Sequence, residues 1–165
     1  MARHQVLNDA IFRAFSSARI PATKEPVGLS RLDRKRPDGL TLIPWQRGKP
    51  LIWDVTVVST LAGSYVDAAA RGASEAAEIA ARRKDAKYSN FQGSYVFNPV
   101  AVEDLGAFSS STLSFLNELG RRISVDSGED KETTFLYQRL SVIIQRFNSI
   151  LIDDTFALLF DEPDM

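Results

Sequence analysis

The stretch RKRPDGLTLIPWQRGKPLIWDVTVV, residues 34–58, decides how the chain folds. Two runs rich in β-branched and aliphatic residues, 39–44 and 50–58, flank a polar segment with a glycine, which predicts a β-hairpin. Asp38 lies just before the first run, and Asp54 lies in the middle of the second. A carboxylate in a strand that is apolar on both faces must leave water, so it needs a partner. The partners of these two aspartates therefore decide what the hairpin does.

A turn centred on residues 46–49 predicts where Asp38 lies. It places Asp38 opposite residues 56–57, within about one or two residue rises (each about 3.3 Å) of the strand face shared by Asp54 and Thr56. Two carboxylates this close repel each other unless a proton or a cation lies between them. With oxygen ligands only, the expected ion is Mg²⁺ or Mn²⁺. The alternative is a Pro-Asp-Gly turn for Asp38 and a buried arginine partner for Asp54.

The rest of the chain predicts an α/β fold with a small mixed sheet flanked by helices. The first three strands are expected to form an antiparallel meander, and the fourth to run parallel to the third after a helical crossover. The expected elements are a helix over 3–18, a proline-punctuated edge strand over 20–29, the two hairpin strands, an alanine-rich helix over 61–88 with a break at Gly72, a strand over 93–102, and helices within 109–128 and 129–158. Together they give an αβββαβ core over residues 3–102 and a helical extension over residues 110–158.

Composition limits the classes of chemistry. The chain has 165 residues, 44% of them hydrophobic and 25% charged, which suits one globular domain over residues 1–160 with a disordered tail at 161–165. No apolar run approaches the roughly 20 residues needed to cross a bilayer, so no membrane partner and an intracellular location are expected. There is no cysteine, and the single histidine, His4, is expected at the surface. Thiolate sites are excluded, and carboxylates, lysines and hydroxyls remain.

Charge is distributed unevenly along the chain. Residues 1–56 carry ten Lys or Arg against five Asp or Glu, whereas residues 57–165 carry ten against sixteen. The basic part contains Asp38 and Asp54, with Lys35 and Arg36 next to the first of them. A basic rim around paired carboxylates suits an anionic substrate that is held through a cation, and a solvated basic loop is the alternative.

The sequence Arg36-Pro37-Asp38, followed across a hairpin by Trp-Asp-Val-Thr at 53–56, resembles the signature of the PD-(D/E)XK nuclease superfamily. The resemblance covers residues 3–102 and implies a restriction-endonuclease-like fold. It implies Asp38 and Asp54 as metal ligands, with the Val55 carbonyl as a further one. It also implies hydrolysis of a phosphodiester by a metal-activated water.

The chain departs from that superfamily at one position, because Thr56 stands where a lysine is expected two residues after the second acid. The superfamily is known to move this lysine onto the following helix, where Lys84 and Lys87 are candidates. Lys84 and Tyr88 are four residues apart and share a helix face. The alternative for both lysines is a solvated helix end that complements the helix dipole.

Five residues complete the expected site. Glu25 is a third candidate metal ligand, and its alternative is an exposed edge glutamate that pairs with Lys24 or an arginine. Lys35, Arg36, Thr56 and Tyr88 are the candidate substrate-binding residues.

The leading hypothesis is a metal-dependent nuclease that acts on nucleic acid, with DNA favoured over RNA. A looser resemblance, carried by RPDG, WDVT, KY, PVAVEDLG and QRLSVIIQR, is to the domain that follows reverse transcriptase in some retroelement-like proteins. It implies a reverse transcriptase in the same polypeptide and a nuclear location. The alternatives are a catalytically inactive nuclease-like module that binds nucleic acid or protein, and a helical oligomerisation domain over residues 110–158 that forms a homodimer.

Overall fold

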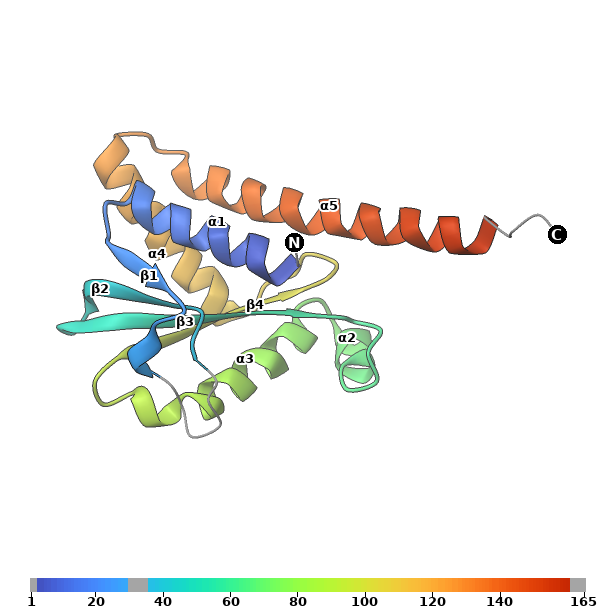
Figure 1. Ribbon diagram of the computed structural model, residues 1–165, viewed down its shortest axis with the longest axis horizontal. Helices are drawn as coiled ribbons and strands as arrows, with labels where there is room; N and C mark the ends of the chain where they lie inside the picture. Colours follow the sequence, from blue (N-terminus) through green and yellow to red (C-terminus); the bar gives the residue numbers. More distant parts are fainter. Residues whose placement is uncertain (1–2, 30–35, 161–165) are drawn as a thin grey trace.

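The computed structural model describes residues 3–29 and 36–160, and for residues 155–160 it describes the backbone only. It has an α/β architecture in which helices cover both faces of a small mixed sheet (Figure 1). In chain order the elements are α1 (Arg3–Ser17), β1 (Ala22–Lys24), the 3₁₀ helix η1 (Val27–Leu29), β2 (Gly39–Gln46), β3 (Lys49–Val58), α2 (Val66–Arg71), α3 (Glu75–Lys87), the 3₁₀ helix η2 (Ser89–Phe91), β4 (Val96–Glu103), α4 (Ser110–Ser127) and α5 (Glu132–Phe160).

The described part of the chain forms a four-stranded sheet in the order β1-β2-β3-β4. The first three strands pair antiparallel, and β4 runs parallel to β3, with α2 and α3 in the crossover. Arg47 and Gly48 connect β2 to β3, with φ angles of 54° and 70°. Two consecutive positive φ angles are typical of the type I′ turn, whose twist matches that of the strands. The predicted meander, hairpin and parallel crossover are therefore confirmed.

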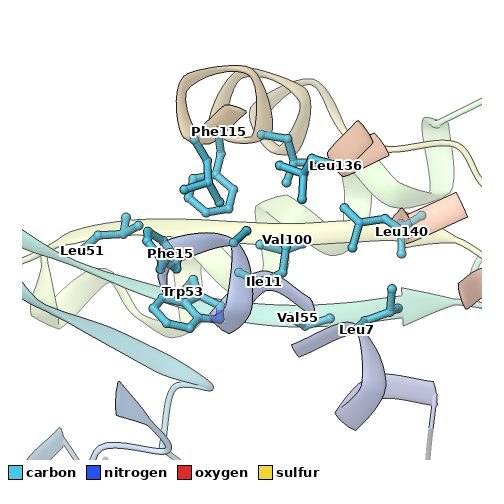
Figure 2. Close-up of a cluster of buried hydrophobic side chains, with 14 of the residues drawn as sticks. Leu7, Ile11, Phe15, Leu51, Trp53, Val55, Val100, Phe115, Leu136 and Leu140 are labelled. Carbon is cyan, nitrogen blue, oxygen red and sulfur yellow. The ribbon is translucent and has the colours of Figure 1, made fainter. Parts of the chain in front are cut away.

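One face of the sheet is covered by α1, α4 and α5 (Figure 1). Alternate residues of β3 point to this face, where Trp53 stacks on Phe15 with ring centroids 4.8 Å apart. Figure 2 shows these two rings among aliphatic side chains from the three helices and from β4. The fully buried side chains of this layer include Leu7, Ile11, Phe15, Leu51, Trp53, Val55, Leu116, Leu119, Leu136 and Leu140. This apolar layer is the main core.

The opposite face of the sheet is covered by α2 and α3 (Figure 1). Its contact layer consists mainly of alanines: Ala76, Ala77, Ala80 and Ala81 of α3 lie with Ala101 of β4 and Val58 of β3. Small side chains allow a helix to lie close to a sheet, so α3 brings its own polar residues near the strands.

The structure confirms the predicted break in one helical segment and corrects the length of one strand. The alanine-rich segment 61–88 forms two helices, α2 and α3, that are separated at Gly72, as the predicted break indicates. The edge strand expected over 20–29 is short, because only Ala22–Lys24 pairs with β2. Glu25 follows with a φ of 49°, which turns the backbone out of the strand. Lys35 and the tail at 161–165 lie outside the described residues.

Within residues 3–29 and 36–160, no helix combines the length and the apolar character that crossing a membrane requires.

Candidate functional site

The hairpin brings Asp38 directly beside Asp54, which corrects the predicted register. The prediction placed Asp38 opposite residues 56–57, but Gly39 pairs with Trp53, and the Asp38 N–H donates to the Trp53 carbonyl at 2.9 Å. Two register shifts in β2, between Leu40 and Gln46, are the cause. A bulge adds residues to one strand only, so the partner of every later residue changes.

Asp38 is held by two donors and is only 8% exposed. Its Oδ2 atom accepts a hydrogen bond from the Val55 N–H at 2.6 Å and lies 2.9 Å from Nε2 of His4. Burial acts to raise the pKa of the Asp38 carboxyl, but the hydrogen bonds from His4 and Val55 outweigh it and lower that pKa. Asp38 therefore ionises before Asp54 as the pH rises.

Asp54 is 3% exposed, and its Oδ2 atom lies 2.6 Å from Nζ of Lys84. Burial, and next the negative charge of Asp38, raise the pKa of Asp54 to about 6, although Lys84 acts in the opposite direction. One lysine thus does not balance two buried carboxyl groups. The two carboxylates therefore repel each other whenever Asp54 is ionised.

Lys84 reaches Asp54 because α3 lies close to the sheet. Ala80 and Ala81, one helical turn before Lys84, pack against the strands. The Lys84 side chain is 24% exposed, so its ammonium group lies at the boundary between the sheet and solvent. Lys84 therefore lies beside Asp54, as expected for a helix lysine that replaces the strand lysine absent at position 56. Its role in catalysis stays a prediction.

A surface cavity of about 340 Å³ lies over the two aspartates. Its lining combines three acids with four basic or potentially basic side chains. The lining residues are His4, Glu25, Arg36, Asp38, Asp54, Lys84, Lys87 and Tyr88. Seven of the ten predicted site residues therefore lie around one cavity, and this surface can accommodate an anionic group next to the aspartates.

Glu25 and Arg36 are held at the rim through the backbone. The Glu25 N–H donates to the Asp38 carbonyl at 3.0 Å, and the Tyr88 hydroxyl donates to the Arg36 carbonyl at 3.3 Å. Tyr88 is fully buried, and the Lys87 ammonium lies 5.2 Å from the centre of its ring. In this structure Tyr88 positions the segment that carries Arg36, and a direct contact between Tyr88 and substrate stays a prediction.

Two of the predicted residues lie differently from the rest. Thr56 is half-buried on the same face of β3 as Asp54, but it is outside the residues that line the cavity. The Val55 N–H points at Asp38, and the carbonyl of a strand residue points to the same side as its N–H. The Val55 carbonyl therefore faces the side of Asp38, where the predicted third ligand belongs.

His4 is exposed, as expected, but the sequence reasoning missed its contact with Asp38. It lies on the same face of α1 as Asn8, four residues later. Asn8 is buried, donates to the Asp38 carbonyl at 3.2 Å and accepts from the Trp53 indole N–H at 2.7 Å. Two polar residues on the face that otherwise carries Leu7 and Ile11 were the signal available in the sequence.

The donor set suits a hard divalent cation that keeps part of its water shell. Within the described residues, no group of three or more His, Asp and Glu side chains is arranged to hold a metal ion. The available donors are the carboxylates of Asp38 and Asp54 and the Val55 carbonyl. Mg²⁺ is commonly bound through one or two carboxylates, with water and substrate phosphate as the other ligands. The residues present therefore fit Mg²⁺ or Mn²⁺, and they do not fit a closed, all-protein cage.

Comparison with known proteins adds no assignment: no protein-family model matches the chain, and no curated protein matches it.

Proposed function

We propose that this chain is a metal-dependent nuclease domain of the PD-(D/E)XK type, with Asp38 and Asp54 as ligands of Mg²⁺ or Mn²⁺. One observation carries the proposal. Two buried aspartates from neighbouring strands meet in one cavity, and the ammonium group of Lys84 lies 2.6 Å from one of them. The order of α1, β1, β2, β3, α3 and β4 supports a restriction-endonuclease-like fold.

The need for a cation follows from the charges at the site. The burial of Asp54, and next the negative charge of Asp38, raise the pKa of Asp54 to about 6 without a metal. A divalent ion between the carboxylates would remove this repulsion and would favour the ionised form of both. When bound, such an ion supplies an activated water and polarises a phosphate oxygen.

The remaining residues have separate tasks in this proposal. Lys84 takes the place of the strand lysine, orienting the attacking water or stabilising charge that develops on the phosphate. Arg36 and Lys87 bind the phosphate backbone of the nucleic acid from the cavity rim. His4 holds the Asp38 carboxylate in place through its ring nitrogen.

The inactive module remains the second candidate, and a specific observation favours it. Each aspartate already has a partner within the chain, since His4 contacts Asp38 and Lys84 contacts Asp54. A site satisfied in this way can serve binding alone. The two functions differ in whether Mg²⁺ or Mn²⁺ changes the behaviour of the protein.

Cleavage of supercoiled plasmid, single-stranded DNA and single-stranded RNA in Mg²⁺ or Mn²⁺ tests the proposal. We expect cleavage that EDTA abolishes, with DNA as the preferred substrate. Asp54→Asn and Lys84→Ala should reduce it by about a hundredfold or more, in the range typical of catalytic groups. Asp67→Asn, a change of the same kind at an exposed residue of α2, is the matched control.

Folded wild-type protein that cleaves none of these substrates, and whose thermal stability does not respond to either metal, would exclude the nuclease. Binding to DNA without a metal would then favour the inactive module. A thermal shift in metal without cleavage would retain the ion site and contradict the choice of substrate. A reverse transcriptase in the same polypeptide and a nuclear location stay predictions.

A further inference from the structure

The longest helix, α5, continues beyond the body of the fold (Figure 1). Leu136, Leu140 and Ile144 anchor it, and each is 1% exposed in the main core. Asn148 makes a hydrogen bond of 2.6 Å to the Asp104 carbonyl. Every residue from 149 to 154 is exposed. The C-terminal part of α5 therefore presents an exposed surface to which another protein can bind.

One face of α5 carries a continuous exposed stripe. Its members follow one another at intervals of three and four residues, so they lie on one side of the helix over about 27 Å. They are Phe135, Arg139, Val142, Arg146, Ile150 and Asp153. The three apolar members are 40% to 52% exposed, which is unusual for large side chains at regular helical spacing. Apolar residues alternate with charged residues along the stripe, which is basic over its first part and acidic at its last residue.

The beginning of the stripe borders a basic apolar groove. A cavity of about 630 Å³ lies between α1 and α5, two helices on the face of the sheet opposite α3 (Figure 1). Phe135, Val142 and Ile143 supply its apolar lining, and Arg13 and Arg139 supply its charge. A segment that fits this groove is apolar and acidic.

The end of the stripe has the complementary character. Residues 149–154 read Ser-Ile-Leu-Ile-Asp-Asp, with three apolar residues, two acids and no base. Ile150 and Ile152 are 50% and 57% exposed, and Asp153 and Asp154 are exposed as well. One helix therefore carries a basic apolar half and an acidic apolar half on its exposed surface.

We propose that a second copy of this chain packs antiparallel along α5 and forms a homodimer. Antiparallel packing places residues 149–154 of each copy on the groove of the other, with Asp153 and Asp154 near Arg13, Arg139 or Arg146. A parallel pair would place like charges together at both ends, and it would also align the two helix dipoles unfavourably. The groove at this interface shares no lining residue with the cavity over the aspartates.

A charge-exchange experiment tests the dimer and its direction, using the full chain in sedimentation equilibrium. We expect wild-type protein to dimerise, and more tightly at low salt than at high salt. Arg139→Glu/Arg146→Glu and Asp153→Lys/Asp154→Lys should each weaken the dimer by about tenfold or more, because each variant opposes like charges at both ends. An equal mixture of the two variants should recover a heterodimer, since every charge then faces its opposite.

Arg71→Glu/Arg82→Glu is the matched control, since it makes the same change in net charge at exposed residues of α2 and α3. It should dimerise like the wild type. Wild-type protein that stays monomeric at about 100 μM would overturn the proposal, because this concentration is well above a micromolar Kd. The proposal would be overturned in this case even if the stripe bound a different protein. A dimer that persists in both charge variants, or a mixture that does not recover one, would also overturn it.

Discussion

Trp53 and Asp54 are neighbours on β3, yet they face two different layers of the molecule. Trp53 enters the apolar layer under α1, α4 and α5, where its ring stacks on Phe15. Asp54 enters the layer under α3, where it meets Lys84 and the charge of Asp38. Successive residues of a strand point to opposite faces, so a single strand supplies both environments.

The two layers differ in what their packing achieves. Large rings and aliphatic chains fill the first layer and provide most of the buried apolar surface. The second layer consists mainly of alanines, which bury less surface but allow α3 to approach the strands. The comparison indicates that the face covered by α1, α4 and α5 provides most of the stability. The face covered by α3 holds buried charges, which lower the stability. Removing the Trp53 ring should therefore lower stability, whereas removing the buried charge of Asp54 should raise it.

The largest effect is expected from Trp53→Ala. Trp53 is fully buried, its indole N–H donates to Asn8, and its ring covers Gly39, where an added Cβ would lie 1.9 Å from a ring atom. Removing the ring should lower the free energy of unfolding by about 3 to 5 kcal/mol, and the melting temperature by about 10 °C or more. Leu42→Ala, at an exposed residue of β2, is the control and should change thermal unfolding little. Equal losses in both variants would contradict the assignment of the main core.

The second prediction concerns Asp54, whose ionised form should lower the free energy of unfolding. Its pKa is about 6 in the folded protein against an ordinary value of 3.8, so the folded state holds an extra proton between these values. Without metal, stability should fall as the pH rises from about 4 to 7, by up to about 3 kcal/mol. The pKa of His4, which is also raised, gives a loss in the same direction.

Asp54→Asn separates these contributions. The variant should be more stable than the wild type at pH 8 without metal and should lose the Asp54 part of the pH dependence. Urea unfolding at pH 5 and pH 8, with and without Mg²⁺, measures this. Mg²⁺ should stabilise only the wild type at pH 8. A variant that is less stable than the wild type at pH 8 would mean that the ion pair with Lys84 outweighs the repulsion from Asp38.

Much of this difference between the faces could be predicted from the sequence, because it depends on local patterns. Alternation along residues 50–58 placed Asp54 and Thr56 on one face, and glycine in the connection marked the hairpin. The superfamily resemblance named Lys84 and Lys87 as candidates to replace a strand lysine, and helical spacing placed Lys84 and Tyr88 on one helix face. Each of these inferences uses residues that are close in the sequence, where backbone geometry fixes the relation between side chains.

The contacts that the sequence did not predict are those between distant segments. The shifts between Leu40 and Gln46 depend on how β2 fits its partners, and a strand pattern with period two carries no record of a bulge. His4 reaches Asp38 across 34 residues, so its role depends on where α1 docks on the sheet. Glu25 leaves the edge strand through a positive φ, which the proline nearby did not reveal.

An intermediate effect is expected from Ala80→Leu, which tests the close approach of α3. Ala80 is 3% exposed within the alanine layer and lies one turn from Lys84. A larger side chain should cost about 1 to 3 kcal/mol of stability and move the helix away from the sheet. A shift of about 1 Å in Lys84 should then lower cleavage on the order of a hundredfold. Ala86→Leu, at an exposed position of the same helix, is the control for both measurements.

The smallest effect is expected from His4→Ala, which removes the contact between α1 and the Asp38 carboxylate. The pKa of His4 is raised chiefly by its hydrogen bond to Asp38, so this bond stabilises the fold most below the ordinary pKa of histidine and is lost as the pH rises through the raised value. The loss of stability should be about 1 kcal/mol or less, and it should be larger at pH 5.5 than at pH 8.5. Comparing the variant with the wild type at the same pH removes the effect of Asp54 titration on stability, since both proteins contain Asp54. An equal loss at both pH values would mean that His4 acts by packing alone. The charge of its imidazole would then not contribute to holding the Asp38 carboxylate.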